Sequence, residues 1–379
     1  MIKHVKSIGI CLQSLLRPAC LAVLVSVIVS GAGLVLEGTY LMPSAVAEEN
    51  KPRQKTRRVP SLSEAVYKKL SEGQEAIDLK DFATAKDIVM KALERSRRYN
   101  ENEIANLHNM LGYIYYLEDD YQGALREYKI VVSQGDKIPE GLESTTLYTV
   151  AQLSYVEENY RDALKYMEIW ISKALNPSAD PRFFLATVYY QMKDYDRAIE
   201  QMELGIAIAQ ERNTKITEQN WGLLTFLYFE KEDWPNVIKT LQILVEKFPK
   251  REHWVRLAGV YGQEGYEKEQ MYTLEAAYTA GFLEKQTDYT NLAGLLMQEE
   301  VPYRAAKVLL AGFQAEAIER EDKTLQSLGQ AWQLSQEVDK AIEVYEEAAE
   351  LSGDGKIFER LSYLYLEDDQ FDKCVAAAS

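Results

Sequence analysis

The stretch LGYIYYLEDDYQGAL, residues 111–125, sets the pattern of the whole chain, because its 15-residue frame keeps returning. The frame opens with apolar residues at helical spacing and continues with two or three acidic or polar residues. An aromatic residue usually follows, with a small residue three positions later. The other copies begin at residues 72, 150, 185, 224, 257, 292, 328 and 361. A pattern seen nine times indicates a repeat architecture before it indicates chemistry.

Each frame predicts two helices joined by a short polar turn, and the acids of the quoted stretch, Glu118, Asp119 and Asp120, fall on that turn. Carboxylates favour the start of a following helix, where unpaired N–H groups present partial positive charge. Successive acidic turns lie about a repeat apart, and the alternating acids of a calcium loop are absent from the sequence. We therefore interpret the acids as solvated turn residues and expect no metal site.

The small residue of each frame is expected where the second helix crosses the first closely, since a large side chain would separate the two. These residues are Ala85, Ala124, Ala163, Ala198, Val237, Ala305, Ala341 and Cys374. Gly112 and its counterparts are expected to serve the first helix in the same way. Cys374 is thus predicted to be a packing residue rather than a reactive thiol.

These positions resemble the tetratricopeptide repeat, a 34-residue helix pair with an aromatic, Leu-Gly, Tyr, Ala, Phe and Pro at fixed offsets. The fullest matches run from Trp221 to Pro249 and from Leu325 to Tyr345. The resemblance implies an all-α fold, a right-handed superhelix (α-solenoid) of about nine helix pairs over residues 65–379, with the last pair incomplete. Since repeat arrays normally end in a solvating cap, we also expect either a truncated chain or a second surface over the last repeat.

Composition limits what such an array binds. The net charge of −16 opposes contact with phosphate backbones, so nucleic acid is not an expected partner. The three cysteines, two of them within the first 20 residues, do not allow a disulfide framework. No HExxH, GxSxG, GxxxxGK[ST] or GxGxxG motif occurs, and His108 lies far from His253. We expect a non-enzymatic protein without a cofactor.

The first 47 residues resemble an export signal. Basic residues precede an apolar run at 19–36, and Ala45-Val46-Ala47 fits the small-x-small cleavage rule, with Glu48 as the new terminus. The alternative is an uncleaved membrane anchor, because the apolar run approaches the length that spans a bilayer. Either case predicts a periplasmic protein that meets the membrane only through this segment. Residues 48–64 are expected to form a basic, solvated linker.

In the tetratricopeptide family, first-helix positions offset from the buried ones line a concave binding surface. The resemblance therefore implies a groove for a protein partner, and the aromatic residues suit a polypeptide ligand. The mapped groove residues are Asn109, Tyr113, Tyr116, Tyr148, Gln152, Tyr155, Phe183, Tyr190, Phe226 and Phe229. The alternative left open for each residue is packing between repeats.

A narrower likeness concerns the stretches 57–78, 138–153 and 176–203, which look like exported repeat proteins of Gram-negative bacteria. Those proteins accompany the TonB–ExbB–ExbD apparatus, which energises the uptake of iron carriers. The likeness implies an accessory scaffold with TonB, ExbB or ExbD components as partners. The alternative function is a cell-envelope or peptidoglycan-processing factor whose groove binds glycan or a wall enzyme.

Overall fold

The computed structural model describes residues 57–352 and 355–378. The expected signal peptide or anchor at 1–47, with its cleavage point between Ala47 and Glu48, lies outside the described residues. Among the described helices, none is both long enough and apolar enough to cross a membrane.

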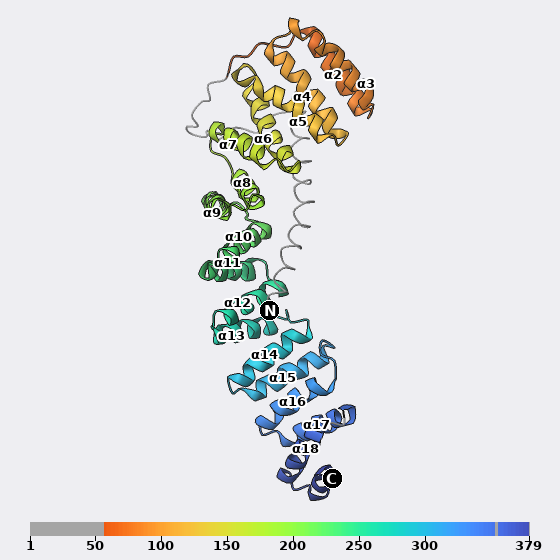
Figure 1. Cartoon of the computed structure of the whole chain (residues 1–379), viewed down its shortest axis with the longest axis vertical. Helices are drawn as coiled ribbons and strands as arrows, with labels where there is room; N and C mark the ends of the chain where they lie inside the picture. Colours follow the sequence, from red (N-terminus) through yellow and green to blue (C-terminus); the bar gives the residue numbers. More distant parts are fainter. Residues whose placement is uncertain (1–56, 353–354, 379) are drawn as a thin grey trace, which may run out of the picture. The chain divides into compact units, whose positions relative to one another are not determined.

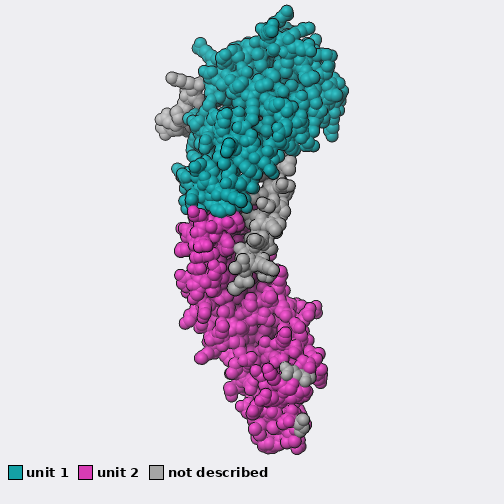
Figure 2. Space-filling view, in the orientation of Figure 1, with its two compact units in different colours: residues 1–213 teal, residues 214–379 magenta. Residues whose placement is uncertain are grey.

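The chain is built from helix pairs that fall into two compact units, one ending at Asn213 and the other beginning at Thr214 (Figures 1 and 2). The pairs of the first unit are α2 (Glu64–Asp78) with α3 (Phe82–Leu93), α4 (Glu101–Leu117) with α5 (Tyr121–Ser133), α6 (Glu140–Val156) with α7 (Tyr160–Lys173), and α8 (Asp180–Gln191) with α9 (Tyr195–Glu211). Short 3-10 turns, η1 (Ser96–Arg98) and η2 (Gly135–Lys137), precede α4 and α6.

The second unit continues with five pairs. They are α10 (Glu218–Glu230) with α11 (Trp234–Lys247), α12 (Arg251–Gln263) with α13 (Glu267–Thr279), α14 (Gln286–Gln298) with α15 (Pro302–Gln314), α16 (Asp322–Leu334) with α17 (Val338–Ser352), and α18 (Gly355–Glu367) with α19 (Phe371–Ala378). Each helix packs most closely on its partner within the pair. The prediction of an all-α solenoid of about nine helix pairs is thereby confirmed for the described residues, and the last helix of the ninth pair, α19, has eight residues. The repeat pattern indicated one continuous array, whereas the contacts divide it into two units.

The turn inside each pair has one conformation, which explains the acids of the quoted stretch. One residue of every such turn has a positive φ, for example Asp119 at 60° and Glu158 at 58°. At the first of these, the N–H of Asp120 returns to the carbonyl of Tyr115 at 2.9 Å, which closes the end of α4. The Asp120 carboxylate then accepts the N–H of Gly123 at 2.7 Å and caps the start of α5. The interpretation of these acids as turn and helix-start residues is confirmed.

Small residues occupy the close crossings of the helices, as the frame predicts. The alanines at the predicted crossing position are fully buried in both units, among them Ala124 and Ala341. Gly112 is required as glycine, because a Cβ there would lie 2.9 Å from the ring of Tyr128 on α5. Cys374 is partly buried against the core of the second unit, in agreement with a packing role.

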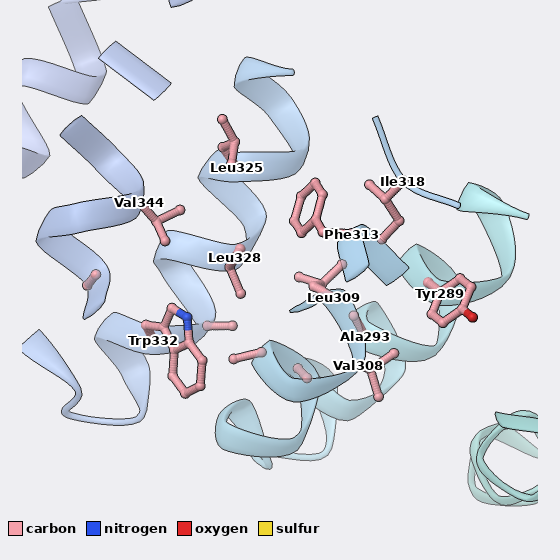
Figure 3. Close-up of a cluster of buried hydrophobic side chains, with 14 of the residues drawn as sticks. Tyr289, Ala293, Val308, Leu309, Phe313, Ile318, Leu325, Leu328, Trp332 and Val344 are labelled. Atoms are coloured by element: carbon pink, nitrogen blue, oxygen red, sulfur yellow. The ribbon is translucent and has the colours of Figure 1, made fainter. Parts of the chain in front are cut away.

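One buried cluster of the second unit runs through consecutive helix pairs from α12 to α18. Tyr289, Leu309, Phe313, Leu328 and Trp332 come from α14, α15 and α16 and lie in one buried cluster (Figure 3). Such continuity is the property of a solenoid, in which each repeat buries its apolar face against its neighbours.

The last part of the expected basic linker lies against the first unit. The Arg57 guanidinium is 2.5 Å from the Glu143 carboxylate, which is 3% exposed at the start of α6. The Asn102 side chain on α4 donates to the carbonyl of Pro60 at 2.8 Å. These two contacts attach residues 57–60 to α4 and α6, since the buried polar groups of the helices need partners, while Arg58, Pro60, Ser61 and Ser63 stay exposed.

Candidate partner-binding surface

Three of the predicted groove tyrosines, Tyr116, Tyr155 and Tyr190, lie at the ends of first helices, where each faces an aromatic residue of the second helix. In the first unit these pairs are Tyr116–Tyr121, Tyr155–Tyr160 and Tyr190–Tyr195, with ring centroids 5.8, 5.7 and 6.4 Å apart. We call them the three aromatic rungs. They form because the turn reverses the chain within five residues, so that the last turn of one helix faces the first turn of the next. All six rings are partly exposed.

Neighbouring rungs are connected by apolar contacts. The Tyr155 ring meets that of Phe184 on α8 in a T-shaped arrangement, with centroids 5.7 Å apart. Its hydroxyl accepts a hydrogen bond from the Gln191 side chain at 3.3 Å. Tyr116 packs on the cluster that contains Val150 and Leu153 of α6. The three rungs therefore lie on adjacent repeats within one packed body.

Tyr148 lies near the middle of α6 and packs on the last turns of α7. Its ring packs edge-on against Trp170 with centroids 5.2 Å apart, and the indole N–H donates to the Ser144 hydroxyl at 2.9 Å. Burial, with a smaller contribution from Asp180, raises the pKa of the Tyr148 phenol to about 12. This tyrosine is thus a neutral hydrogen-bonding group at any physiological pH.

Tyr113 shares a site with Tyr116 and with the buried Tyr128. Burial raises the pKa of Tyr116, followed by the charge of Asp119 and the neighbouring Tyr113. Burial also raises the pKa of Tyr128, with further contributions from Tyr113 and Tyr116. The structure therefore brings three phenols together on α4 and α5, with only Tyr113 and Tyr116 partly exposed.

Two of the predicted groove residues are buried. Phe183 is 8% exposed, and its ring fills the space above Gly205 on α9, where a Cβ would lie 2.6 Å from it. Gln152 is 7% exposed on α6. Both therefore contribute to packing in the unbound protein, while Asn109 on α4 stays partly exposed.

Phe226 and Phe229 belong to α10 of the second unit. There, Phe229 forms a rung of the same kind with Trp234, with centroids 5.3 Å apart. Tyr261 and Tyr266 form another, at 6.2 Å. The same pairing of aromatic residues across a turn therefore recurs in both units, and each unit has its own set of aromatic rungs.

Reasoning from the sequence found the first member of each rung but missed the second. Tyr121, Tyr160, Tyr195 and Phe184 were absent from the predicted set, although all four are partly exposed. The signal was present for the rungs, because an aromatic residue follows Tyr116, Tyr155 and Tyr190 by five positions. Only the turn geometry shows that these two positions face each other.

The turns that carry the first two rungs are acidic, with Glu118, Asp119 and Asp120 in one and Glu157 and Glu158 in the other. The turn of the third rung holds one lysine and one carboxylate, Lys193 and Asp194. Some of this charge is engaged locally, since Glu118 forms an ion pair with Lys86 at 2.5 Å. The Tyr121 hydroxyl lies 3.2 Å from the exposed carboxylate of Asp119. The edge of the first unit therefore combines partly exposed rings with an excess of negative charge.

The described residues contain no group of three or more His, Cys, Asp or Glu side chains arranged to hold a metal ion. The surface consists of phenol rings, amides and carboxylates. It can stack on apolar groups, accept and donate hydrogen bonds, and attract cations.

Comparison with protein families matches residues 179–212, the α8–α9 pair, to the tetratricopeptide repeat. A comparison with curated proteins gives no match. Among solved structures, a tetratricopeptide repeat protein from Parabacteroides merdae is 15% identical and covers 80% of this chain and 100% of its own, with a TM-score of 0.41. The C-terminal part of a TPR repeat-containing protein from Cytophaga hutchinsonii is 12% identical, with coverages of 76% and 98% and a TM-score of 0.41. YrrB, described as a TPR protein with an unusual peptide-binding site, is 13% identical, with coverages of 50% and 90% and a TM-score of 0.37.

The family match supports the tetratricopeptide-repeat resemblance for one full helix pair, while the helices themselves establish the fold of the described residues. Tetratricopeptide-repeat proteins are generally non-catalytic. This chain is an α-solenoid with a tetratricopeptide repeat at residues 179–212, which is the fold of a protein–protein interaction scaffold.

Proposed function

We propose that this protein is a periplasmic scaffold that holds an extended segment of a partner protein along the aromatic rungs of its first unit. The observation that carries the proposal is the series Tyr116–Tyr121, Tyr155–Tyr160 and Tyr190–Tyr195 on three consecutive repeats. Aromatic rings offer a large contact area at a low cost in conformational entropy, and they dominate the binding energy of many interfaces. A row of them on adjacent repeats suits a ligand that runs along the array.

The proposed biological setting is the TonB–ExbB–ExbD system, in which the protein is an accessory component of energy-coupled uptake of iron carriers. This part of the proposal rests on the likeness of residues 57–78, 138–153 and 176–203 to exported proteins that accompany that system. The periplasmic location rests on the signal-like residues 1–47.

Photo-crosslinking in intact cells tests the proposal. A photoreactive amino acid replaces Tyr121, whose ring is partly exposed beside Tyr116, and crosslinked partners are identified by mass spectrometry. The matched control places it at Tyr272 on α13, a tyrosine that is 59% exposed in the second unit. Crosslinks to TonB, ExbB or ExbD from position 121 and not from 272 support the proposal. Crosslinks to wall synthases instead would favour the cell-envelope function, and equal capture from both positions would refute the rung surface.

A further inference from the structure

A small polar cleft of the second unit is formed by α16 and α18, the first helices of two neighbouring pairs. It has a volume of about 210 Å³ and is lined by Lys323, Gln326, Ser327 and Gln330 of α16 and by Arg360 of α18. The four residues of α16 follow one another at steps of three, one and three, so they share one face of that helix. Each of the five side chains is a hydrogen-bond donor, and two of them are cations.

The charge of this cleft is opposite to that of the chain, which has 59 acidic against 43 basic residues. Lys323 and Arg360 line the cleft, and no carboxylate does so among the residues that the structure describes. Asp322, the residue before Lys323, accepts the backbone N–H of Lys323 at 2.8 Å. Within the described part of the chain, neither cation forms an ion pair. Two like charges in one small cleft repel each other, and a bound anion removes that repulsion.

Arg360 is held in place by a buried tyrosine. Its Nη1 donates to the hydroxyl of Tyr345 on α17 at 2.9 Å, and its guanidinium lies 5.9 Å from the centroid of the same ring. Because Tyr345 is fully buried, it is a rigid support. The arginine itself is exposed, so its remaining N–H groups are accessible to a ligand. A planar guanidinium fixed in this way binds a carboxylate through two parallel hydrogen bonds.

The two glutamines indicate what kind of molecule carries the anion. The side-chain amides of Gln326 and Gln330 lie one helical turn apart and form no hydrogen bond with the residues that the structure describes. An amide both donates and accepts, as do the peptide groups of a polypeptide ligand. The net charge of −16 opposes a nucleic acid. The lining therefore suits an anionic group carried by a polypeptide.

We propose that this cleft binds the side-chain carboxylate of an acidic segment in a protein ligand. Lys323 and Arg360 pair with the carboxylate, while Gln326 and Gln330 bond the peptide groups beside it. The site is separate from the aromatic rungs of the first unit, and it does not depend on the function proposed for them. The second unit thereby has a binding site of its own.

Calorimetric titration of the purified full chain with synthetic peptides tests the inference. The probe is a peptide of a few Glu-Ala units, acetylated and amidated so that side-chain carboxylates are its only charges. The controls replace every glutamate by glutamine or by phosphoserine. We expect the glutamate peptide to bind at least about tenfold more tightly than the glutamine peptide, because two charge-assisted contacts are lost in the control. Equal affinity for these two peptides, or no binding of the glutamate peptide, would overturn the inference. Binding of the phosphoserine peptide about tenfold tighter than the glutamate peptide would assign the cleft to phosphate instead.

Variants identify the site. Lys323→Gln is expected to weaken binding of the glutamate peptide about three- to fivefold, and the charge reversal Lys323→Glu about tenfold or more. The matched change Lys268→Gln, at an exposed lysine of α13 outside the cleft, leaves binding unchanged. Arg360→Lys keeps the charge but loses the planar fork, and we expect it to weaken binding about threefold or more. Because Lys323 is exposed, its variants keep the test valid if Arg360→Lys destabilises the protein.

Two results would refute the assignment of the site. One is full affinity for the glutamate peptide in Lys323→Glu, and the other is an equal loss of affinity in Lys268→Gln and Lys323→Gln. The rung variant Tyr155→Ala, in the first unit, is expected to bind the glutamate peptide with full affinity while it is folded. Loss of that binding in folded Tyr155→Ala would place the acidic ligand on the rungs and refute a separate site in the second unit.

Discussion

The ring of Tyr155 on α6 meets the ring of Phe184 on α8 edge to face, with centroids 5.7 Å apart. The same tyrosine packs on Tyr160 across its own turn. One side chain therefore joins a rung to the next repeat, so the surface proposed to bind a partner also contributes to the cohesion of the unit.

Replacement of Tyr155 by alanine is expected to reduce the free energy of unfolding by about 1–3 kcal/mol, because two aromatic contacts are lost. Tyr116→Ala, which removes the ring contact with Tyr121, is expected to cost less. Urea denaturation of the two variants measures the difference. Equal stability of Tyr155→Ala and the wild type would show that the α6–α8 contact contributes nothing.

The helix cap at the first unit's second turn gives a separate prediction. Asp120→Ala removes the acceptor of the Gly123 N–H and is expected to cost about 1 kcal/mol. The adjacent change Asp119→Gly is expected to be neutral or slightly stabilising, since glycine adopts the φ of 60° without strain. Thermal unfolding distinguishes the two, and a larger loss for Asp119→Gly would contradict this account of the turn.

Gly112 tests the packing of α4 on α5. A methyl group at this position would lie 2.9 Å from the Tyr128 ring, so Gly112→Ala is expected to destabilise the protein by about 1–3 kcal/mol. Gly141→Ala is the matched control, because it meets no heavy atom within 4 Å and replaces glycine in α6. We expect Gly141→Ala to be neutral or to stabilise by up to about 1 kcal/mol. Destabilisation by both variants to the same extent would mean that the ring contact is not the cause.

The Asp288–Arg251 pair predicts the acid sensitivity of the second unit. Burial alone would raise the pKa of Asp288. Hydrogen bonds from Arg251 and from the N–H groups of Lys285 and Glu284 lower the pKa by more than burial raises it, so the net shift is downward. The stability from this shift is complete above the ordinary aspartate value of 3.8 and is lost as pH falls through the lower folded pKa. The measurement is the unfolding free energy as a function of pH.

Asp288→Asn is expected to remove that part of the acid dependence. It also leaves the half-buried Arg251 without its carboxylate, at a cost of about 3–5 kcal/mol near neutral pH. Glu347→Gln is the control, since its pair with Arg320 is solvent-exposed and is expected to contribute less than about 1 kcal/mol. An unchanged pH profile in Asp288→Asn would show that other carboxylates govern the acid limb.

Much of the fold follows from the sequence frame, because the spacing of Leu111, Tyr115 and Ala124 is itself the packing pattern of a helix pair. The acids at 118–120 were also interpretable, since turn conformation and helix capping are local properties. Division into two units was not predictable, because it depends on how many contacts cross each connection and not on the repeated frame.

The site was predictable only in part. The register of the first helices selects Tyr116 and Tyr155, but it does not show which neighbour each ring meets. Phe183 is at the register position of Tyr148 and is buried, because Gly205 on α9 leaves space for its ring. The contact of Arg57 with Glu143 spans 86 residues and has no local signal in the sequence.

The most direct test of the central claim compares partner affinity with stability in one double variant. Tyr116→Ala combined with Tyr155→Ala is measured for binding of the crosslinked partner at a temperature where it and the Tyr266→Ala control are both fully folded. The account predicts a loss of about 2–4 kcal/mol in binding free energy for the double variant and none for the control. Unchanged affinity in the double variant, with a lowered melting temperature, would show that these rings hold the repeats together and do not bind the partner.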